Sequence, residues 1–304
     1  MNDECAPVVI FVFNRPLHTQ KVLKALSQCI LAESTELYIY ADGPRTNEDS
    51  KLVQLTRECI RKVNGFKKVN IIESSTNRGL AESIISGVTE IVLKQGKIIV
   101  LEDDIVVAQN FLLYMNQSLN YYRDNNRVWQ VSSYSFAPLA KMAESKCLLP
   151  LTNCWGWATW ADRWAHFERN PTKLIKSYDK QQRYEFDLQG RFNFWEQVKA
   201  NYAGRTKTWA VFWYATVYEK GGLTVYPREV YSENIGLDGS GVHCEDLNFI
   251  PRELSKLPVD SFYPKVVDYN VYDEVCAHLA KDVLGLYERM YRKINRLFKR
   301  YLSL

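Results

Sequence analysis

The sequence lacks the features that define several large protein classes. Its 7 cysteines include no Cys-x-x-Cys pair, so no zinc knuckle is indicated, and their odd number suits reduced thiols in a cytoplasmic protein. No apolar run approaches the roughly 18 residues of a membrane-spanning helix. The first apolar run, Val8 to Phe13, follows acidic residues and is typical of a strand, not of a signal peptide. We therefore expect a protein that is made and kept in the cytoplasm.

A strong excess of one charge is also missing. The formal net charge is +4, which is too small to indicate nucleic-acid binding, and we expect no nucleic-acid partner. No internal repeat and no low-complexity segment is present. With 304 residues, 46% of them hydrophobic, the chain is long enough for one large α/β domain or two smaller ones.

Segments typical of strands and helices alternate in the first third of the chain. Nearly continuous apolar or β-branched runs predict strands at 7–13, 36–40, 68–73 and 96–104. Helical spacing of apolar residues follows the first three, at 14–29, 50–63 and 77–94. This alternation predicts an α/β fold with a parallel, doubly wound sheet.

Three short motifs directly follow predicted strands: "FNRP" (13–16), "ADGPR" (41–45) and "EDD" (102–104). Ligands of such sheets bind beyond the carboxyl ends of the strands, so these motifs should converge on one crevice. Three adjacent acids at the end of a buried strand repel one another, and a cation should offset them. A hard ion such as Mg²⁺ or Mn²⁺ takes oxygen ligands and also binds diphosphate, which makes Asp104 a candidate metal ligand. A solvated acidic turn is the alternative interpretation.

The alternation of predicted strands and helices becomes less regular after residue 107. Residues 108–124 and 209–221 have helical spacing, whereas 128–136 and 222–227 are typical of strands. Residues 171–207 are polar and aromatic without a clear period. The tail, 282–304, combines helical spacing of apolar residues with six Arg or Lys between 289 and 300. Such a helix either lies on an anionic membrane surface or packs on its own domain with a solvated basic face.

Six motifs in order resemble those of GT-A nucleotide-sugar glycosyltransferases. They are "PVVIFVFNRPLHTQKVLKAL", "IYADGP", "NRGLAESI", "VLEDDIVVAQNFLLYM", "CWGWATWADRW" and "GLTVYPREVYSENIG". The chain is most similar to the N-acetylglucosaminyltransferase I family and related bacterial glycosyltransferases, over roughly residues 7 to 243. The resemblance implies a GT-A (Rossmann-like), mostly parallel central sheet flanked by helices. The implied domain covers 1–247, with a nucleotide-binding half to about 107 and an acceptor half at about 108–247. A helical C-terminal extension follows at 248–304.

The resemblance assigns roles to several residues of the nucleotide-binding half. It implies that Arg15, next to Asn14, contacts the nucleotide and that Asp42 binds its base, while Arg78 reaches the diphosphate. Asp104 would bind Mn²⁺ or Mg²⁺, and Glu102 and Asp103 would contact ribose or sugar. From the residues alone, Arg15 can equally be a surface arginine, and both Asp42 and Arg78 are ordinary turn residues.

The acceptor half contains the Trp-rich segment and the candidates for the catalytic base. Trp157 lies in a Trp-rich segment that lines sugar pockets in the family, although such tryptophans can equally form a core. The family's catalytic aspartate follows a Trp, but here Ala210 follows Trp209. The candidates for the base that takes the proton from the acceptor hydroxyl are Asp162, Glu196 and Asp238. His243, beyond two glycines, is a second candidate metal ligand.

These observations predict a metal-dependent glycosyltransferase. Its donor would be a nucleotide diphosphate sugar, expected to be UDP-linked, and its acceptor a saccharide or lipid-linked glycan. We expect a role in bacterial surface polysaccharide or lipopolysaccharide synthesis, with peripheral contact to the anionic inner face of the plasma membrane. One alternative is a sugar-phosphate nucleotidyltransferase, although "FNRPLHTQ" lacks the glycines that a triphosphate-binding loop needs. The other alternative is a non-catalytic glycan-binding protein.

Overall fold

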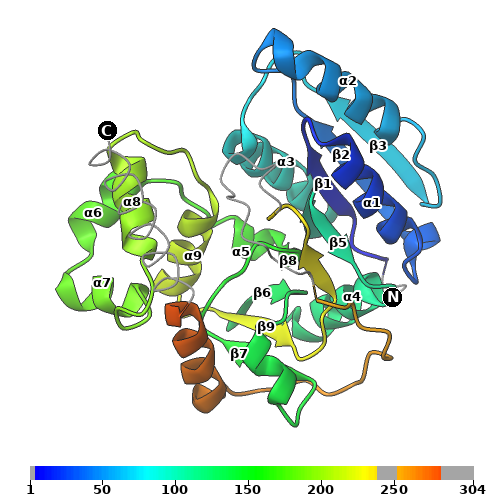
Figure 1. Ribbon diagram of the computed structural model, residues 1–304. Helices are drawn as coiled ribbons and strands as arrows, with labels where there is room; N and C mark the ends of the chain where they lie inside the picture. The colour runs from blue at the N-terminus through cyan, green and yellow to red at the C-terminus, as the bar shows by residue number, and fades with distance from the viewer. Residues whose placement is uncertain (1–3, 238–251, 282–304) are drawn as a thin grey trace, which may run out of the picture.

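The computed structural model describes residues 4–237 and 252–281, and the first part of the chain has the predicted alternation (Figure 1). Its elements are β1 (Val8–Val12), α1 (Pro16–Ser27), β2 (Glu36–Ala41), α2 (Asn47–Ile60), β3 (Lys68–Glu73), α3 (Leu80–Gln95) and β4 (Lys97–Glu102). All four predicted strands and the three helices between them are confirmed.

These four strands form the parallel half of an eight-stranded sheet with the order β3-β2-β1-β4-β8-β6-β9-β7. The other half comprises β6 (Val128–Ser132), β7 (Lys146–Leu149), β8 (Trp157–Trp160) and β9 (Leu223–Pro227). β8 is antiparallel to both β4 and β6, and β6 is parallel to β9, while β7 is an antiparallel edge strand. The sheet is therefore mostly parallel, as predicted. A two-stranded ribbon joins β5 (Ile105–Val107) to β10 (Ser232–Asn234).

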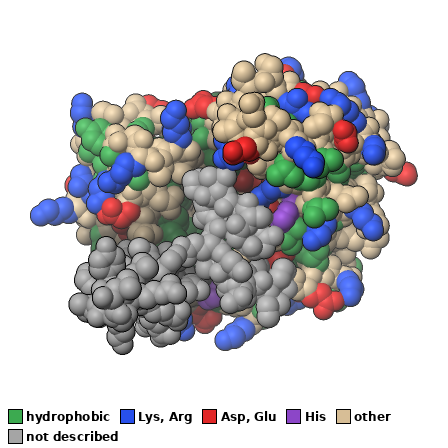
Figure 2. Space-filling model, turned by 45° about the horizontal axis from the view of Figure 1, so that its top comes forward, with side chains coloured by type: hydrophobic (Ala, Val, Ile, Leu, Met, Phe, Trp, Pro, Cys, Tyr) green, Lys and Arg blue, Asp and Glu red, His purple; other side chains and the backbone are tan. Residues whose placement is uncertain are grey.

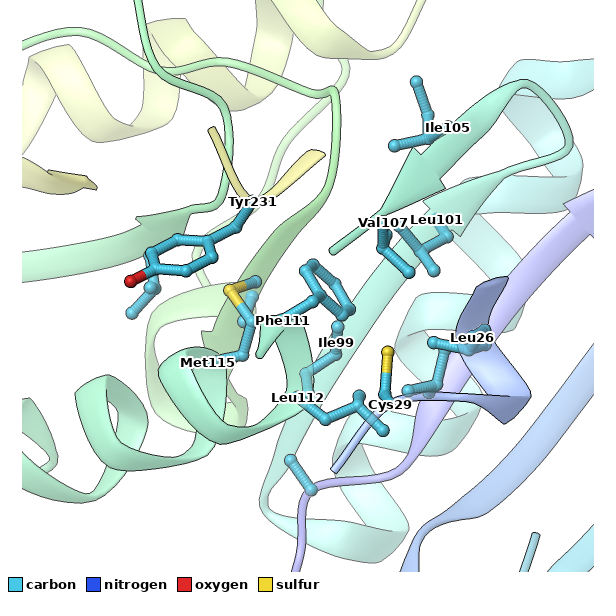
Figure 3. Close-up of a cluster of buried hydrophobic side chains, with 14 of the residues drawn as sticks. Leu26, Cys29, Ile99, Leu101, Ile105, Val107, Phe111, Leu112, Met115 and Tyr231 are labelled. Carbon is cyan, nitrogen blue, oxygen red and sulfur yellow. The ribbon is translucent and has the colours of Figure 1, made fainter. Parts of the chain in front are cut away.

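Alternating residues of β1 face two different cores. Val8 and Ile10 pack toward α1, α2 and α4 (Phe111–Tyr122), whereas Val9 and Phe11 pack toward α3. This period of two is what a strand buried on both faces requires. Figure 3 shows part of the first core, where side chains of α1, β4, β5 and α4 point toward one another. The fixed β4–β5 turn between these elements holds the three acids.

A helical lobe fills the stretch in which the sequence shows no clear period. It contains α6 (Pro171–Ser177), α7 (Lys180–Phe186), α8 (Phe194–Tyr202) and α9 (Ala210–Glu219), and it lies beside the sheet in Figure 1. The short α5 (Ala161–Trp164) leads into it. Aromatic side chains make up much of its core, including Phe186, Trp195 and Tyr214. The helices α6, α7 and α8, of seven to nine residues, have too few turns for a periodic signal. The helix α9 lies beyond the stretch without a clear period and confirms the helical spacing predicted at 209–221.

Residues 252–281 pack against α4 and the edge strand β7, and they end in a helical segment at 269–281. The buried Nζ of Lys146 donates to the carbonyl and carboxylate of Asp260, both at 2.9 Å. Leu148 bridges to Val267 in parallel orientation. This segment is therefore part of the folded sheet domain. The predicted basic helix at 282–304 lies outside the described residues.

In the described part of the chain, no helix is both long and apolar enough to span a membrane. On the face seen in Figure 2, Lys and Arg side chains are scattered among acidic ones and do not gather into one basic patch.

Candidate functional site

The carboxyl ends of β1, β2 and β4 lie at one edge of the sheet because the three strands are parallel. β6 ends at the same edge, since β4 and β6 are both antiparallel to β8. The "FNRP", "ADGPR" and "EDD" segments therefore meet there, together with residues 133–135 and the start of β8. We call this the carboxyl edge of the sheet.

A close ion pair joins two of these segments. Arg15, the residue before α1, places Nη1 2.7 Å from Oδ2 of Asp104 and 3.7 Å from Oδ1 of Asp103. The side chains of Arg15 and Asp104 are each 14% exposed, so the pair is screened only partly by water. The cation that three adjacent acids require is, in this structure, a side chain of the protein.

Glu102 and Asp103 lie in a poorly hydrated environment. Burial, with the charges of neighbouring carboxylates added, raises the pKa of Glu102 to about 8 and that of Asp103 to about 7. The guanidinium of Arg15 opposes both increases, and the backbone N–H of Phe13 donates to Asp103 Oδ2 at 3.3 Å. Two carboxyl groups that hold protons near neutral pH are poised to gain charge when a cation arrives.

The chain after β10 covers the Arg15–Asp104 pair. Ile235 donates its backbone N–H to the carbonyl of Asp104 at 2.9 Å, and Gly236 donates to the side chain of Asn234 at 2.7 Å. A Cβ at Gly236 would overlap Asp104 Oδ2 and lie 2.9 Å from Arg15 Nη1. Any larger residue here would force the Asp104 carboxylate, the Arg15 guanidinium or the loop itself to shift.

Asp42 is bound to the backbone of the loop before α3. Its Oδ1 accepts from the N–H groups of Gly43 and Arg78 at 2.9 and 2.8 Å, and its Oδ2 accepts from Gly79 at 2.9 Å. Both oxygens are thus used to fix the start of α3. The side chain of Arg78 is exposed at the same loop.

Asn14 is also engaged within the protein, since its Nδ2 donates to Asp49 at 2.7 Å. Asp49 in turn pairs with Arg45 at 3.0 Å. These contacts join the first loop to α2. Asn14, Arg15, Asp42 and Arg78 therefore all lie at the carboxyl edge, where the sequence predicts them.

Asp162 lies at the other end of the sheet, which corrects its candidacy as the catalytic base. Trp160 pairs with Lys97 at the start of β4, so Asp162, two residues later, lies at the opposite end of β4 from the acids. The six residues of β4, at about 3.3 Å each, separate the two ends by roughly 20 Å. Asp162 instead pairs with Arg163 at 2.5 Å.

Glu196 belongs to the helical lobe. Its side chain is 58% exposed on α8 and forms an ion pair with Lys199 one turn later. No described contact connects it with Glu102, Asp103 or Asp104. Asp238 and His243 lie outside the described residues.

Trp157 is a core residue, which corrects its assignment as a sugar contact. It is 1% exposed and stacks on Trp209 with ring centroids 5.3 Å apart. Trp160 and Trp164 are also buried. Of the four tryptophans in this segment, only Trp155 is partly exposed, and it lies at the carboxyl edge.

The thiol of Cys154, the residue before Trp155, is influenced by the charges of the acids. The pKa of its thiol is raised, first by burial and next by the charge of Glu102, with a smaller effect of Asp104. The thiol is thus close to these carboxylates and protonated. It is not set up as a nucleophile, because the thiolate is the reactive form.

The described side chains include no group of three or more His, Cys, Asp or Glu arranged to hold a metal ion. The oxygen donors of Glu102, Asp103 and Asp104 have the right chemistry for Mg²⁺ or Mn²⁺. Their geometry does not fit one as it stands, because Arg15 Nη1 lies 2.7 Å from Oδ2 of Asp104. A cation can bind to this oxygen only if Arg15 moves away.

Sequence reasoning missed two residues of this edge, Glu233 and Arg252. Glu233 lies within the motif "YSENIG" on β10, but one acid in a glycine-bounded loop is no signal by itself. Its partner Arg252 is 19 residues further along, in a segment without periodicity. Only the tertiary structure brings the two together.

No protein-family model matches this chain, and no curated protein matches it. The fold is similar to that of S. aureus TarS, at 10% identity and a TM-score of 0.40, covering 74% of this chain and 36% of that one. It is similar to mouse xyloside xylosyltransferase 1, at 11% identity and 0.37, covering 71% and 82%. LgtC follows at 11% identity and 0.37, covering 72% of each chain. This chain therefore spans about a third of the TarS structure, and values this low assign neither a family nor an activity.

Proposed function

We propose that this protein is a glycosyltransferase that moves a sugar from a nucleotide diphosphate donor to a saccharide. One observation carries the proposal: the acids Glu102, Asp103 and Asp104 lie next to Arg15 where parallel β1 and β4 end. Diphosphates of nucleotides bind at this edge of open α/β sheets. The site combines a cationic side chain for phosphate with carboxylates that bind hydroxyl groups or a metal.

In the reaction that we propose, the acceptor hydroxyl oxygen forms a bond to the anomeric carbon of the donor sugar. The bond from that carbon to the diphosphate oxygen breaks, and the nucleoside diphosphate leaves with the bonding electron pair. The acceptor proton passes to a base that this proposal does not name. Arg15, released from Asp104, would stabilise the negative charge that develops on the diphosphate.

Finer properties of the proposed enzyme follow from the same site. We propose a UDP-linked donor and dependence on Mn²⁺ or Mg²⁺, with Asp104 as the ligand once Arg15 has turned toward phosphate. Such an ion would supply a Lewis acid for the leaving diphosphate. The nearby Glu102 and Asp103 would lose their protons and bind ribose or sugar hydroxyls.

A lipid-linked glycan acceptor and a role in bacterial surface polysaccharide synthesis are further parts of the proposal. They rest on the basic amphipathic sequence at 282–304. Deletion of these residues should reduce binding to vesicles that contain anionic lipid. Unchanged binding would refute the membrane contact and would leave the sugar-transfer proposal intact.

Donor hydrolysis over a panel of UDP-, GDP- and dTDP-sugars, with and without Mn²⁺, tests the activity. Wild type should hydrolyse one class of donor, and Asp104→Ala should lose at least about tenfold of that rate. Asp124→Ala is a matched control, because this exposed acid precedes β6 at the opposite end of the sheet. Equal rates for wild type and Asp104→Ala would remove Asp104 from the mechanism.

Two further assays separate the alternatives. A nucleotidyltransferase would instead release pyrophosphate from a nucleoside triphosphate in the presence of a sugar phosphate. A glycan-binding protein would bind saccharides but neither hydrolyse the donors nor bind UDP or GDP with Mn²⁺ in calorimetry.

A further inference from the structure

Glu233 and Arg252 form a charged pair at the carboxyl edge. The Nε of Arg252 donates to Oε2 of Glu233 at 2.8 Å, and the side chain of the glutamate is 2% exposed whereas that of the arginine is 30% exposed. Nη1 of Arg252 donates to the carbonyl of Ser135, three residues after the end of β6. The pair thus joins β10 and residue 252 to the end of β6.

One oxygen and one nitrogen of this pair form no hydrogen bond. Oε1 of Glu233 and Nη2 of Arg252 are both buried, and neither has a hydrogen-bond partner. A buried polar atom without a partner is unfavourable, and such atoms in a native protein usually indicate a missing water or ligand. Here an acceptor and a donor are left open on two side chains that are already bonded to each other.

This combination matches a hydroxyl group. A hydroxyl is one donor and also an acceptor, so its O–H can donate to Oε1 while its oxygen accepts from Nη2. A phosphate would be repelled by the carboxylate, and an ammonium by the guanidinium. An alcohol is therefore better suited to the pair than either ion.

Aromatic rings lie beside the pair. The guanidinium of Arg252 lies 4.8 Å from the ring centroid of Tyr134, and Tyr134 meets Trp155 edge to face at 4.9 Å. Both rings are partly exposed. Binding sites for small molecules commonly place a few polar groups among aromatic side chains, and sugars present both hydroxyls and apolar C–H faces.

The pair is close to the acids. Glu233 pairs in register with Val106, two residues after Asp104, and Ile235 donates to the carbonyl of Asp104. Trp155 directly follows Cys154, and the charge of Glu102 contributes to the raised pKa of the Cys154 thiol. A hydroxyl at Glu233 and Arg252 would thus lie beside a sugar bound at the acids.

We propose that Glu233 and Arg252 together bind one hydroxyl group of a saccharide, next to the aromatic surface of Tyr134 and Trp155. This site deepens the proposed function and rests on it. The hydroxyl belongs either to the acceptor or to the sugar of the donor, and the two sources are distinguished below. Burial raises the pKa of Glu233, and the guanidinium of Arg252 opposes this increase. In this proposal Glu233 binds the hydroxyl and is not the base, because its carboxylate is already held by Arg252 at 2.8 Å.

The test compares Glu233→Gln and Arg252→Lys with wild type. Methyl glycosides of glucose, galactose and N-acetylglucosamine are titrated by saturation-transfer NMR, and donor hydrolysis is measured without glycoside. If the hydroxyl is the acceptor's, glycoside affinity falls about tenfold in both variants and the KM for donor hydrolysis is unchanged. If it is the donor's, that KM rises about tenfold and glycoside affinity is unchanged. Unchanged values in both assays mean that only water occupies the site, and they overturn the proposal.

Glu229→Gln is the matched control. Glu229 lies on the same segment as Glu233 and accepts from Ser255 Oγ at 3.1 Å, so it also fastens the chain after residue 252. Its substitution should affect stability but not glycoside or donor binding. An equal loss in this variant would show that the Glu233 effect is structural and would overturn the proposal. If Glu233→Gln does not fold, Arg252→Lys, which keeps the charge, decides between the same outcomes.

Failure of the proposed function gives a different result. A wild-type protein that hydrolyses no donor, yet binds a glycoside that Glu233→Gln does not bind, would refute sugar transfer and retain this site. If the wild type hydrolyses a donor and the variants behave like the wild type, sugar transfer is retained and the hydroxyl site is refuted.

Discussion

The carboxylate of Asp42, at the end of β2, accepts the backbone N–H of Gly79, 2.9 Å away at the start of α3. The neighbouring N–H of Arg78 donates to the other oxygen at 2.8 Å. A carboxylate at a helix N-terminus satisfies N–H groups that have no partner within the helix, and it also interacts favourably with the helix dipole. In the absence of ligand, Asp42 therefore stabilises the loop that carries Arg78.

We expect Asp42→Ala to lower the free energy of unfolding by about 1–2 kcal/mol, since it removes a helix-capping carboxylate. Urea denaturation measures the loss. Asp179→Ala is the control, because Asp179 forms a capping box on α7, away from the carboxyl edge. Both variants should lose similar stability, and only Asp42→Ala should also weaken binding of UDP. If the two variants bind UDP equally well, Asp42 does no more than hold α3.

Gly236→Ala should damage the site and leave the fold intact. The added methyl overlaps Oδ2 of Asp104, so either the loop or the Arg15–Asp104 pair must shift. We expect donor hydrolysis to fall about tenfold or more, because small displacements of positioning groups are costly for catalysis. Circular dichroism and urea denaturation check the fold. Gly204→Ala is the control: Gly204 has a φ of 69° and an open surrounding, so alanine there is strained without touching the site. Equal hydrolysis rates for the two variants would contradict the prediction.

The nucleotide-binding half was predictable because its signals are local. Runs such as Val8–Val12 are apolar on both faces, and the switch from a period of 2 to one of 3.6 marks each βα unit. Once the strands are parallel, their carboxyl ends must lie together, so Arg15 and Asp104 could be placed at one edge from sequence alone. Their direct ion pair was not foreseen, because a side-chain contact between residues 89 positions apart depends on the tertiary structure.

The acceptor half was harder to predict for physical reasons. Trp157 and Asp162 lie five residues apart in one motif, yet one is in the core and the other is at the far end of β4. Their positions follow from the antiparallel direction of β8, which the local sequence does not reveal. The position of Glu233 beside Arg252 depends likewise on the tertiary structure. Glu233 lies on β10, a strand of three residues that pairs with β5.

Trp157→Ala should be a stability mutation. Removing a buried indole that packs against Trp209, Trp164 and Trp213 should lower the free energy of unfolding by about 3–5 kcal/mol. Trp155→Ala, at a partly exposed position in the same motif, should lose much less stability than Trp157→Ala. It should show the larger loss of glycoside affinity of the two variants. Thermal unfolding and glycoside titration of both variants check this. The reverse order of stability losses would place Trp155 in the core.

The pH dependence of stability should show the raised pKa values of Glu102 and Asp103. Between the unfolded values near 4 and the folded values of about 8 and about 7, the native protein holds protons that the unfolded chain has lost. The free energy of unfolding therefore falls as pH rises through this window. Urea denaturation in EDTA at about pH 5 and about pH 9 should show this decline, and Glu102→Gln should make it shallower. The same slope in wild type and Glu102→Gln would mean that Glu102 is ionised throughout.

Removal of the Arg15 charge should make the acids bind a metal ion on their own. In wild type, a divalent ion must displace a guanidinium that lies 2.7 Å from Asp104. We expect Arg15→Gln to bind Mn²⁺ about tenfold more tightly than wild type without nucleotide, because a competing cation is gone. It should also bind UDP more weakly, because a phosphate ligand is lost. Electron paramagnetic resonance of free Mn²⁺ measures the first effect, and calorimetry the second. Arg45→Gln is the control, since Arg45, in the loop after β2, pairs with Asp49 on α2 and forms no ion pair with Asp104. Mn²⁺ affinity that is the same in Arg15→Gln and Arg45→Gln would show that Asp104 is not the metal ligand.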